Sequence, residues 1–389
     1  IFTLATELQF NEDSAAQFDS LTALSGTTLS ALQGSAFRAG SYGLRFAQNR
    51  LDRHEPAPAD TTASKGGGSP LLAATAQAAG ASSAAISRAW LASTLSQSVA
   101  SGAETRYEGR DGSQFRIIGG ATYHIGDQDS RLGVTGFETD GWSANLGIEF
   151  ESADNSLLIG AVGTLGESDA DLDSNRGTAE AESTAISIYG QYRTDIVALS
   201  AGYSLADINL STQRQLLGAS ASGQTGGTLN GFFGRLAATI VDEGTWTAGP
   251  EVTITHSDID MNAYTEAGAG ALNLAISSLD RNSTELDLAM KSSIHFETGD
   301  WNGNVLLKAG YQWALSGDQF STAPVAFALA PATSFANPLR PLVNDGLELS
   351  VSANVYSTSG VGLSVGYGGL FGNNGQTTHD LSLRASIAF

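Results

Sequence analysis

Apolar and polar side chains alternate along most of the chain after residue 114. The clearest stretch is STELDLAMKSSIHFE, in which Leu288, Met290 and Ile294 share one parity. Asp287 and Lys291 share the other. Successive side chains of a β-strand point to opposite faces, so this stretch predicts a strand with one apolar and one charged face. Twelve segments show this pattern, near residues 115–125, 141–151, 156–165, 181–192, 195–205, 229–241, 246–257, 284–297, 302–315, 346–357, 361–370 and 379–389.

The lengths of the connections favour a membrane barrel over a soluble sandwich. Connections alternate between tight ones, at 152–155, 193–194, 242–245, 298–301 and 358–360, and longer ones, at 126–140, 166–180, 206–228, 258–283, 316–345 and 371–378. Short turns on one rim and long loops on the other are typical of outer-membrane barrels. The prediction is an all-β transmembrane barrel: a 12-stranded antiparallel outer-membrane β-barrel with an N-terminal α-helical segment. An outer-membrane location in a Gram-negative bacterium follows.

Composition restricts the alternatives further. No run of about 20 apolar residues exists, which excludes spanning helices but leaves spanning strands, of which half the residues can be polar. The chain has no cysteine, so disulfides and thiolate metal sites are excluded. The net charge of −21 argues against nucleic acid as a partner. No cofactor is expected. The chain begins at Ile1 without Met or a secretory signal, so we expect a processed or truncated product.

Two N-terminal stretches have helical features, and a linker separates them. Residues 15–53 carry apolar side chains at helical spacing, and residues 55–80 are rich in Pro, Ala, Gly and Ser. Residues 82–102 form a slim Ser/Ala-rich stretch, of which about 18 helical residues would span about 27 Å, near the thickness of the hydrocarbon core. We therefore expect residues 82–102 to form the helix in the lumen; the alternative is a periplasmic or poorly ordered connector. The helix residues singled out are Ile86, Arg88, Trp90 and Leu91.

The expected organisation has three parts. Residues 1–81 form a pre-barrel segment and linker, residues 82–114 the lumenal helix and its lead-in, and residues 115–389 the barrel. Parity predicts a set of lumen-facing polar residues whose mixed charges could pair across the pore and hold a helix; a generic hydrated wall is the alternative. The set is Arg116, His124, Asn145, Glu149, Gln191, Arg235, Glu285, Asp287, Lys291, Gln312 and Glu348.

Several motifs resemble the translocator unit of classical, monomeric autotransporters of type Va secretion. FDSLTALSGTTLSAL, at residues 18–32, is similar to the family's pre-barrel motif, with Leu21, Leu24, Ser25 and Gly26 matching and Thr27 in place of the usual Glu. Residues 115–150 resemble the first two strands and their loop. The alternating C-terminus resembles the strand that barrel-assembly machinery recognises, formed by Leu381, Leu383, Ala385, Ile387 and Phe389.

The resemblance implies a function and a set of partners. The barrel would be a monomeric pore that exports an upstream passenger domain to the cell surface and anchors it. Its partners would be that passenger, outer-membrane lipid with lipopolysaccharide, and the barrel-assembly machinery. Some relatives cut the passenger off at an Asn in the lumenal helix; residues 82–102 contain no Asn, so we expect no such self-cleavage. The alternatives are a stand-alone porin or surface-binding barrel and, third, an outer-membrane hydrolase.

Candidate chemistry is sparse, and we predict no catalytic residue, metal site or enzyme activity. His256 is the one candidate base, because it has the apolar parity of its strand and lies near a long loop, but no nucleophile accompanies it. DADLDSNRGTAE, at residues 169–180, approaches a calcium-loop spacing. Ser174 stands where that loop requires Gly, so an acidic hairpin is the better interpretation.

Overall fold

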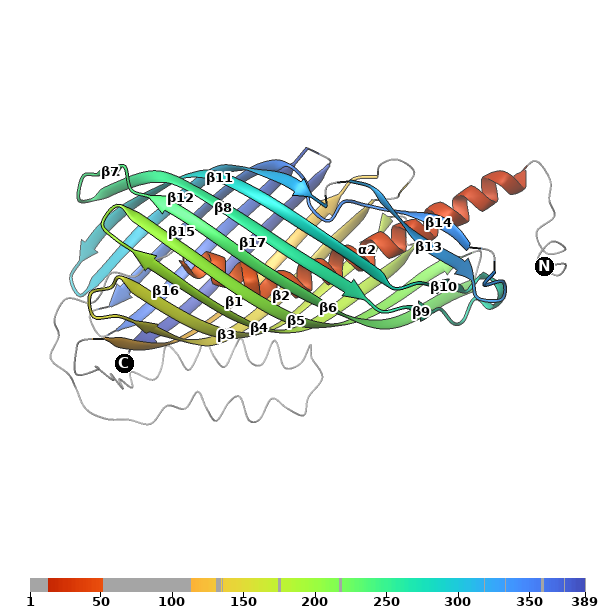
Figure 1. Cartoon of the computed structure of the whole chain (residues 1–389), viewed down its shortest axis with the longest axis horizontal. Coiled ribbons are helices and arrows are strands. Elements are labelled where there is room, and N and C mark those ends of the chain that lie inside the picture. The colour runs from red at the N-terminus through yellow and green to blue at the C-terminus, as the bar shows by residue number, and fades with distance from the viewer. Residues whose placement is uncertain are drawn as a thin grey trace.

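A computed structural model of the chain describes residues 13–51 and 113–388, apart from 131–133, 135, 174–175, 217–218, 318, 333, 358–359 and 374. The lumenal helix expected at residues 82–102, with Ile86, Arg88, Trp90 and Leu91, lies outside the described residues, as do all other expectations for residues 1–12 and 52–112. Phe389 does as well. The described chain forms one long helix, α2 (Asp13–Leu51), and a tilted barrel around it (Figure 1).

Twelve antiparallel strands of the described chain close the barrel, which confirms the predicted fold class. Closure is made by β17 pairing with β1, from Arg116 opposite Ala388 to Gln128 opposite Gln376. The wall strands are β1 (Gln114–Gln128), β2 (Phe137–Glu151), β3 (Leu157–Leu172), β4 (Gly177–Arg193), β5 (Val197–Leu216), β6 (Ala219–Ala238), β8 (Trp246–Met261), β11 (Leu279–Thr298), β12 (Trp301–Ser316), β15 (Gly346–Ser357), β16 (Val361–Gly372) and β17 (Gln376–Ala388).

The outward face carries the apolar band that a bilayer requires. On β11, Leu288, Met290 and Ile294 are 46%, 51% and 49% exposed. Aromatic residues bound the band on β12, with Trp301 at the end that has tight turns and Tyr311 toward the other end. Ten residues of strand span about 34 Å, which a tilt near 40° reduces to about 26 Å along the axis, close to the height of a membrane barrel's apolar band.

The long connections build a second, smaller sheet at one end of the barrel. It contains β9 (Tyr264–Thr265), β10 (Leu274–Ile276), β13 (Ser321–Phe327) and β14 (Ser334–Leu339), in the order β14-β13-β10-β9. A 3-10 turn, η3 (Gly270–Leu272), precedes β10, and a short β7 (Val241–Asp242) lies in a connection at the opposite end. We call the end that carries the small sheet the extracellular end, because outer-membrane barrels have their longer loops there.

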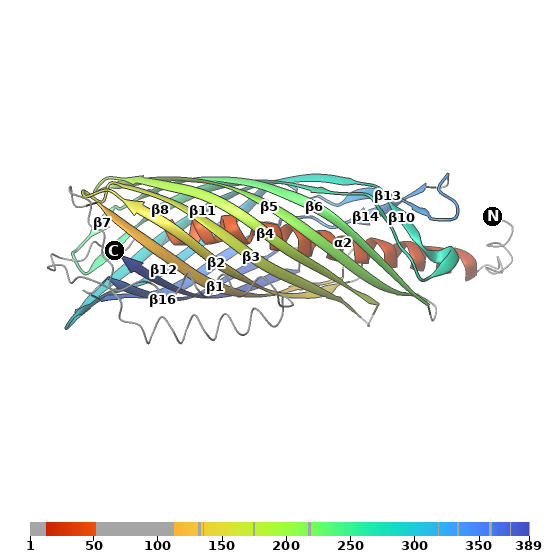
Figure 2. The ribbon, with the colours of Figure 1, turned by 90° about the horizontal axis from the view of Figure 1, so that it is seen from below.

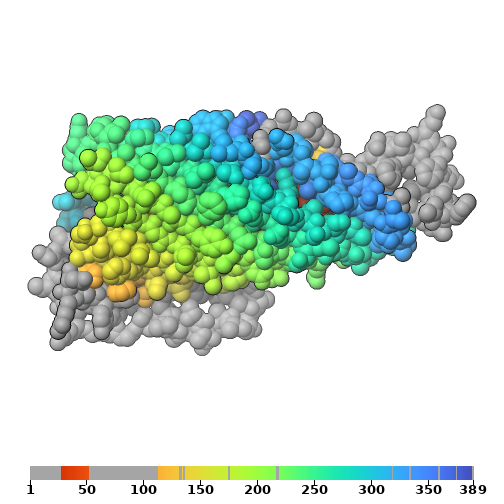
Figure 3. Space-filling model, in the orientation of Figure 1, coloured from red at the N-terminus to blue at the C-terminus, as the bar shows by residue number. Residues whose placement is uncertain are grey.

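Helix α2 runs lengthwise through the barrel (Figures 1 and 2). The space-filling view shows a continuous wall of strands that hides nearly all of the part of the helix drawn in colour (Figure 3). The 39 residues of α2 extend for about 58 Å. No helix among the described residues is long and apolar enough to cross a membrane. Among the described residues, the helix that occupies the lumen is therefore α2, which extends from the tight-turn end past the extracellular sheet. The sequence favoured residues 82–102 for this position, and these lie outside the described residues.

Candidate functional site: the lumen and its helix

Helix α2 lies against one side of the lumen, formed by β2 to β6. It can approach closely because small residues face this wall. A Cβ added at Gly40 would come within 2.8 Å of Leu229 Cβ, and one added at Gly43 within 2.6 Å of Ser187 Oγ. Ser183 Oγ donates a hydrogen bond of 2.8 Å to the backbone oxygen of Ala39. The helix is therefore fitted to this wall by shape.

Buried charges fix the end of the helix nearest the tight turns. Arg50 Nη2 lies 2.6 Å from Glu149 Oε2 on β2, and both side chains are almost fully buried. The hydroxyl of Tyr189 donates to the other carboxylate oxygen at 2.7 Å. Next to this pair, Arg116 Nη2 lies 2.6 Å from Glu151 Oε2. Charges removed from water need such partners, so Glu149 specifies where this end of the helix sits.

Replacing Glu149 by Gln is expected to loosen the helix by about 3 to 5 kcal/mol, because Arg50 would stay buried without its counter-charge. Chymotrypsin cleavage at Phe46, which lies on the same helical segment, reports this loosening. The double variant Glu149→Gln, Arg50→Gln is the control and should be cleaved less than the single variant. Equal cleavage of the wild type and the single variant would show that this pair does not hold the helix.

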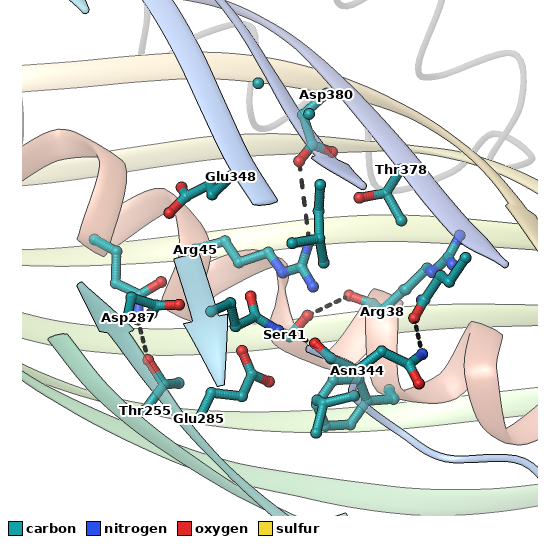
Figure 4. Close-up of a pocket in the computed structure, with 18 of the residues that line it drawn as sticks. Arg38, Ser41, Arg45, Thr255, Glu285, Asp287, Asn344, Glu348, Thr378 and Asp380 are labelled. Carbon is teal, nitrogen blue, oxygen red and sulfur yellow. Dashed lines mark hydrogen bonds and ion pairs between the residues drawn. The ribbon is translucent and has the colours of Figure 1, made fainter. Parts of the chain in front are cut away.

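A second polar cluster joins the middle of the helix to β1 and β17. Arg38 Nη1 donates to His124 Nε2 at 2.7 Å, and Nδ1 of the same imidazole lies 2.6 Å from Asp380 Oδ1. Because the guanidinium can only donate, the imidazole proton sits on Nδ1 and points to the carboxylate. Arg45 reaches the second oxygen of Asp380 at 4.0 Å (Figure 4). Asp380 thereby connects two helix arginines to the wall.

The opposite side of the lumen, along β8 to β17, is not filled by the helix. A cavity of about 220 Å³ lies there and is lined by Arg45 and Gln48 of α2 and by Glu285, Asp287 and Glu348 of the wall (Figure 4). A second cavity of about 300 Å³ lies toward the tight-turn end, and both cavities touch Arg235 and Leu306. The helix therefore packs against one side of the lumen, and cavities remain along the other side.

Glu251 is the centre of a charge network between the two cavities. Its carboxylate lies 3.0 Å from Lys291 Nζ, 3.2 Å from Lys308 Nζ and 3.7 Å from Arg235 Nε. Lys308 also reaches Glu348 at 3.1 Å. Mixed charges thus pair across the strands β6, β8, β11, β12 and β15.

The segment 340–345 folds inward at the extracellular end. Arg340 Nη2 donates to the backbone oxygens of Asp129 and Val134, at 2.6 and 3.0 Å. Its backbone N–H donates to Ser30 Oγ of the helix at 3.2 Å. Arg281 donates to the carbonyl of Arg340 at 2.8 Å. These contacts narrow the mouth of the lumen beside the helix.

The predicted lumen-facing residues all lie on the inner side of the described wall or next to its cavities. Six are buried, namely Arg116, His124, Asn145, Glu149, Gln191 and Arg235, and five are partly exposed, namely Glu285, Asp287, Lys291, Gln312 and Glu348. The structure joins Glu149 and His124 to the helix, and Arg235 and Lys291 to Glu251. Asn145 accepts from Thr164 at 2.8 Å, and Gln191 donates to Ser200 at 3.0 Å.

Sequence reasoning missed the helix side of the site. Arg38, Arg45 and Arg50 belong to a helix that was assigned to the pre-barrel segment. The alternation of residues along each strand could have added Asp380, Glu251 and Lys308 to the predicted lumen-facing set, because each occupies an inward-facing position of its strand. The expectation of no self-cleavage depends on the absence of Asn from residues 82–102. The helix described in the lumen does contain an asparagine, Asn49. Its backbone carbonyl accepts a hydrogen bond of 3.0 Å from Arg384 Nη1.

The acidic segment at 169–180 forms the paired ends of β3 and β4, with Asp169 opposite Glu180. Carboxylate oxygens of Glu167, Asp169 and Glu180 lie within 4.8 Å of one another. Partial burial raises the pKa of Asp169 to about 7, and the neighbouring Glu167 and Glu180 add to this shift. These residues lie beyond the outward apolar positions of β3, which end at Leu165.

Asp169 gives a test of this arrangement by pH. A carboxyl whose folded pKa is raised destabilises the fold when it ionises, so its cost increases from about pH 4 to pH 7 and is constant above. We expect Asp169→Asn to stabilise the barrel at pH 8 and to have a much smaller effect at pH 4, measured by urea unfolding. Asp207→Asn, an exposed site on β5, is the control. An equal gain in the free energy of unfolding at pH 4 and pH 8 would contradict the partly buried, acidic environment assigned to Asp169.

His256, the candidate base, faces outward on β8. Its Nδ1 lies 2.9 Å from Thr284 Oγ1 and its Nε2 3.2 Å from Asp258 Oδ2, and its ring packs 5.2 Å from that of Phe232. These contacts place the imidazole in a polar patch beside the apolar band.

A closed outer wall with an apolar band, a charged lumen and a helix lying lengthwise inside define an outer-membrane β-barrel with an internal plug. The sequence model of the Autotransporter beta-domain family matches residues 115–368, so the chain belongs to that family. No curated protein sequence matches it. The protein is therefore an outer-membrane pore of a Gram-negative bacterium that serves the export of a passenger domain, and its family is a transport family rather than a catalytic one.

Solved structures share this fold at low sequence identity. The translocator domain of the autotransporter NalP from Neisseria meningitidis is 17% identical, with a TM-score of 0.58, over 79% of this chain and 98% of that one. The β-domain of the Bordetella autotransporter BrkA is 10% identical, with a TM-score of 0.50, over 70% and 99% of the two chains. At these identities the likeness concerns the fold.

Proposed function

We propose that α2 closes the pore and anchors the exported passenger. In this proposal the lumen-facing residues of the wall bind the helix and hold it in the pore. The observation that carries the proposal is the pairing of the buried Arg50 of the helix with the buried Glu149 of the wall. Family membership implies a passenger upstream of the barrel. The N-terminus of α2 lies beside the small extracellular sheet, so a chain leaving the helix starts on that side (Figure 1).

The organisation that follows differs from the sequence-based one. Residues 13–51 would be the plug and residues 113–389 the barrel, with residues 52–112 connecting them. The remaining partners are proposed from the resemblance: outer-membrane lipid and lipopolysaccharide around the apolar band, and barrel-assembly machinery at the last strand. One chain closes the described wall by itself, which supports a monomer.

The terminal strand has the outward pattern that an assembly signal needs. Leu381 and Leu383 on β17 are exposed, and Ala385 and Ile387 are partly exposed on the same face. Deleting Phe389 is expected to reduce membrane insertion in cells several-fold while leaving the urea stability of refolded barrel unchanged, because the residue would act in recognition. Heat-modifiable migration of cell envelopes measures insertion. Normal insertion of the deleted form would argue against machine recognition at this residue.

The proposal is tested by conductance. A plugged lumen should conduct little in a planar bilayer until α2 is removed, whereas a stand-alone porin should conduct well with its N-terminal segment in place.

A further inference from the structure

The small extracellular sheet has one face buried and one face open. The buried face packs Leu274, Ile276, Val325 and Leu339 into the core that also contains Leu29 of α2. Along the free edge, β14 follows the N-terminal half of the helix (Figures 1 and 2). At the other edge, Ser222 of β6 bridges Ala267 next to β9. The sheet is therefore anchored to both the helix and the barrel.

The open face carries small side chains without charge, namely Thr322, Pro324, Ser334 and Ala336. Residues 321–338, STAPVAFALAPATSFANP, contain no charged side chain in a protein whose net charge is −21. A groove of about 400 Å³ lies on this sheet, and its lining includes Ala275, Pro324, Pro331 and Ser334. Leu329, at the tip of the β13–β14 turn, is 73% exposed. An uncharged groove next to an exposed leucine is suited to docking a segment with apolar side chains.

We propose that this groove docks residues 2–10 of the same chain. Their sequence, FTLATELQF, places Phe2, Leu4, Leu8 and Phe10 on one parity, with Glu7 and Gln9 on the other. An extended segment with this pattern presents one apolar face and one polar face. The apolar face suits a groove without charges, and the polar face would remain in water.

The distances allow this contact. The backbone N–H of Arg340, next to the end of β14, donates to Ser30 Oγ, which fixes the two elements side by side at that level. From there the helix continues for 17 residues to Asp13, about 26 Å, while β14 continues for five residues, about 17 Å. The helix thus begins about 9 Å beyond the sheet. Twelve extended residues span about 40 Å, so residues 2–10 can fold back onto the groove.

The tether favours this occupant over a second copy of the chain. A segment joined by a few residues has an effective concentration near the millimolar range, which a neighbouring molecule does not reach. Docking would use side chains rather than strand addition, because Pro338 on the β14 edge and Pro324 on the face each lack an N–H donor. The inference is independent of the export proposal, since it concerns two parts of the purified chain.

The chain has no cysteine, so paired substitutions give an unambiguous test. The variant Leu4→Cys, Ala336→Cys, with the second site exposed on the open face, should form a disulfide under mild oxidation about tenfold faster than the control pair. The control is Leu4→Cys, Thr178→Cys, whose second site is exposed at the same end of the barrel on β4. A parity control, Thr3→Cys with Ala336→Cys, should be slower than the Leu4 pair.

A second measurement avoids cysteine chemistry. Ala275→Asp places a charge in the groove and should increase the rate of chymotrypsin cleavage within residues 2–10, whereas Thr178→Asp should not. Heat-modifiable migration shows whether each variant retains its barrel. Equal disulfide rates for the Ala336 and Thr178 pairs, or cleavage unaffected by Ala275→Asp, would overturn the inference, whatever the outcome of export assays.

Discussion

Removal of residues 1–51 is expected to raise single-channel conductance in a planar bilayer several-fold without unfolding the barrel. A helix is about 10 to 12 Å wide, and the lumen of a barrel with eight strands is already filled by side chains. Twelve strands leave space for about one helix, which α2 occupies. The wall keeps its own pairs after deletion, such as Arg116 with Glu151 and Lys308 with Glu348.

A second deletion identifies which segment is the plug. Removing residues 82–102 alone should leave the conductance low, because α2 would remain in place. If that deletion opened the pore and the removal of residues 1–51 did not, the lumenal position of α2 would be refuted while the barrel assignment remained.

Leu288→Arg is expected to cost about 2 to 4 kcal/mol of barrel stability in lipid, because it places a charge at the middle of the apolar band. Leu288 lies opposite Tyr311 on β12 and Val252 on β8, within the outward apolar face. Urea unfolding in vesicles gives the free-energy difference from wild type.

The matched control introduces the same side chain on the lumen side. Gln312 lies opposite Asp287 and lines the cavity beside the helix, so Gln312→Arg adds a cation next to carboxylates in water. Its cost should stay below about 1 kcal/mol, as for a solvated ion pair. Equal costs for Leu288→Arg and Gln312→Arg would mean that the assigned register of β11 and β12 is wrong.

The barrel was predictable because its pattern is local. In each strand, alternate side chains face the lipid and the lumen, so the sequence alone shows which residues share a face. The alternation of tight and long connections shows at which end of the barrel each connection lies. The predicted strands stopped too early at their extracellular ends, since β5 and β6 each extend over 20 residues. Their extensions, such as STQRQL and ASASGQ, carry few large apolar side chains because they lie outside the bilayer, so hydropathy did not distinguish strand from loop.

The identity of the lumenal helix was not predictable in the same way. Residues 82–102 have the length and the small side chains that suit a lumen, and they precede the first strand directly. What selects residues 13–51 in the structure is a set of long-range contacts, such as Arg50 with Glu149, 99 positions apart, and Gly43 against Ser187. The alternation along the strand places Glu149 on the inner face of the barrel. It cannot show that Arg50 is the partner, because the two residues meet only when the barrel closes around the helix.

The most direct test of the account follows the passenger's route. A signal peptide and an epitope placed before Ile1 would be expressed in a Gram-negative host, and intact cells would be probed with antibody and with external protease. We expect the epitope to be labelled by the antibody and removed by the protease at the cell surface while the barrel stays heat-modifiable. An epitope that remains in the periplasm beside a correctly inserted barrel would contradict this account.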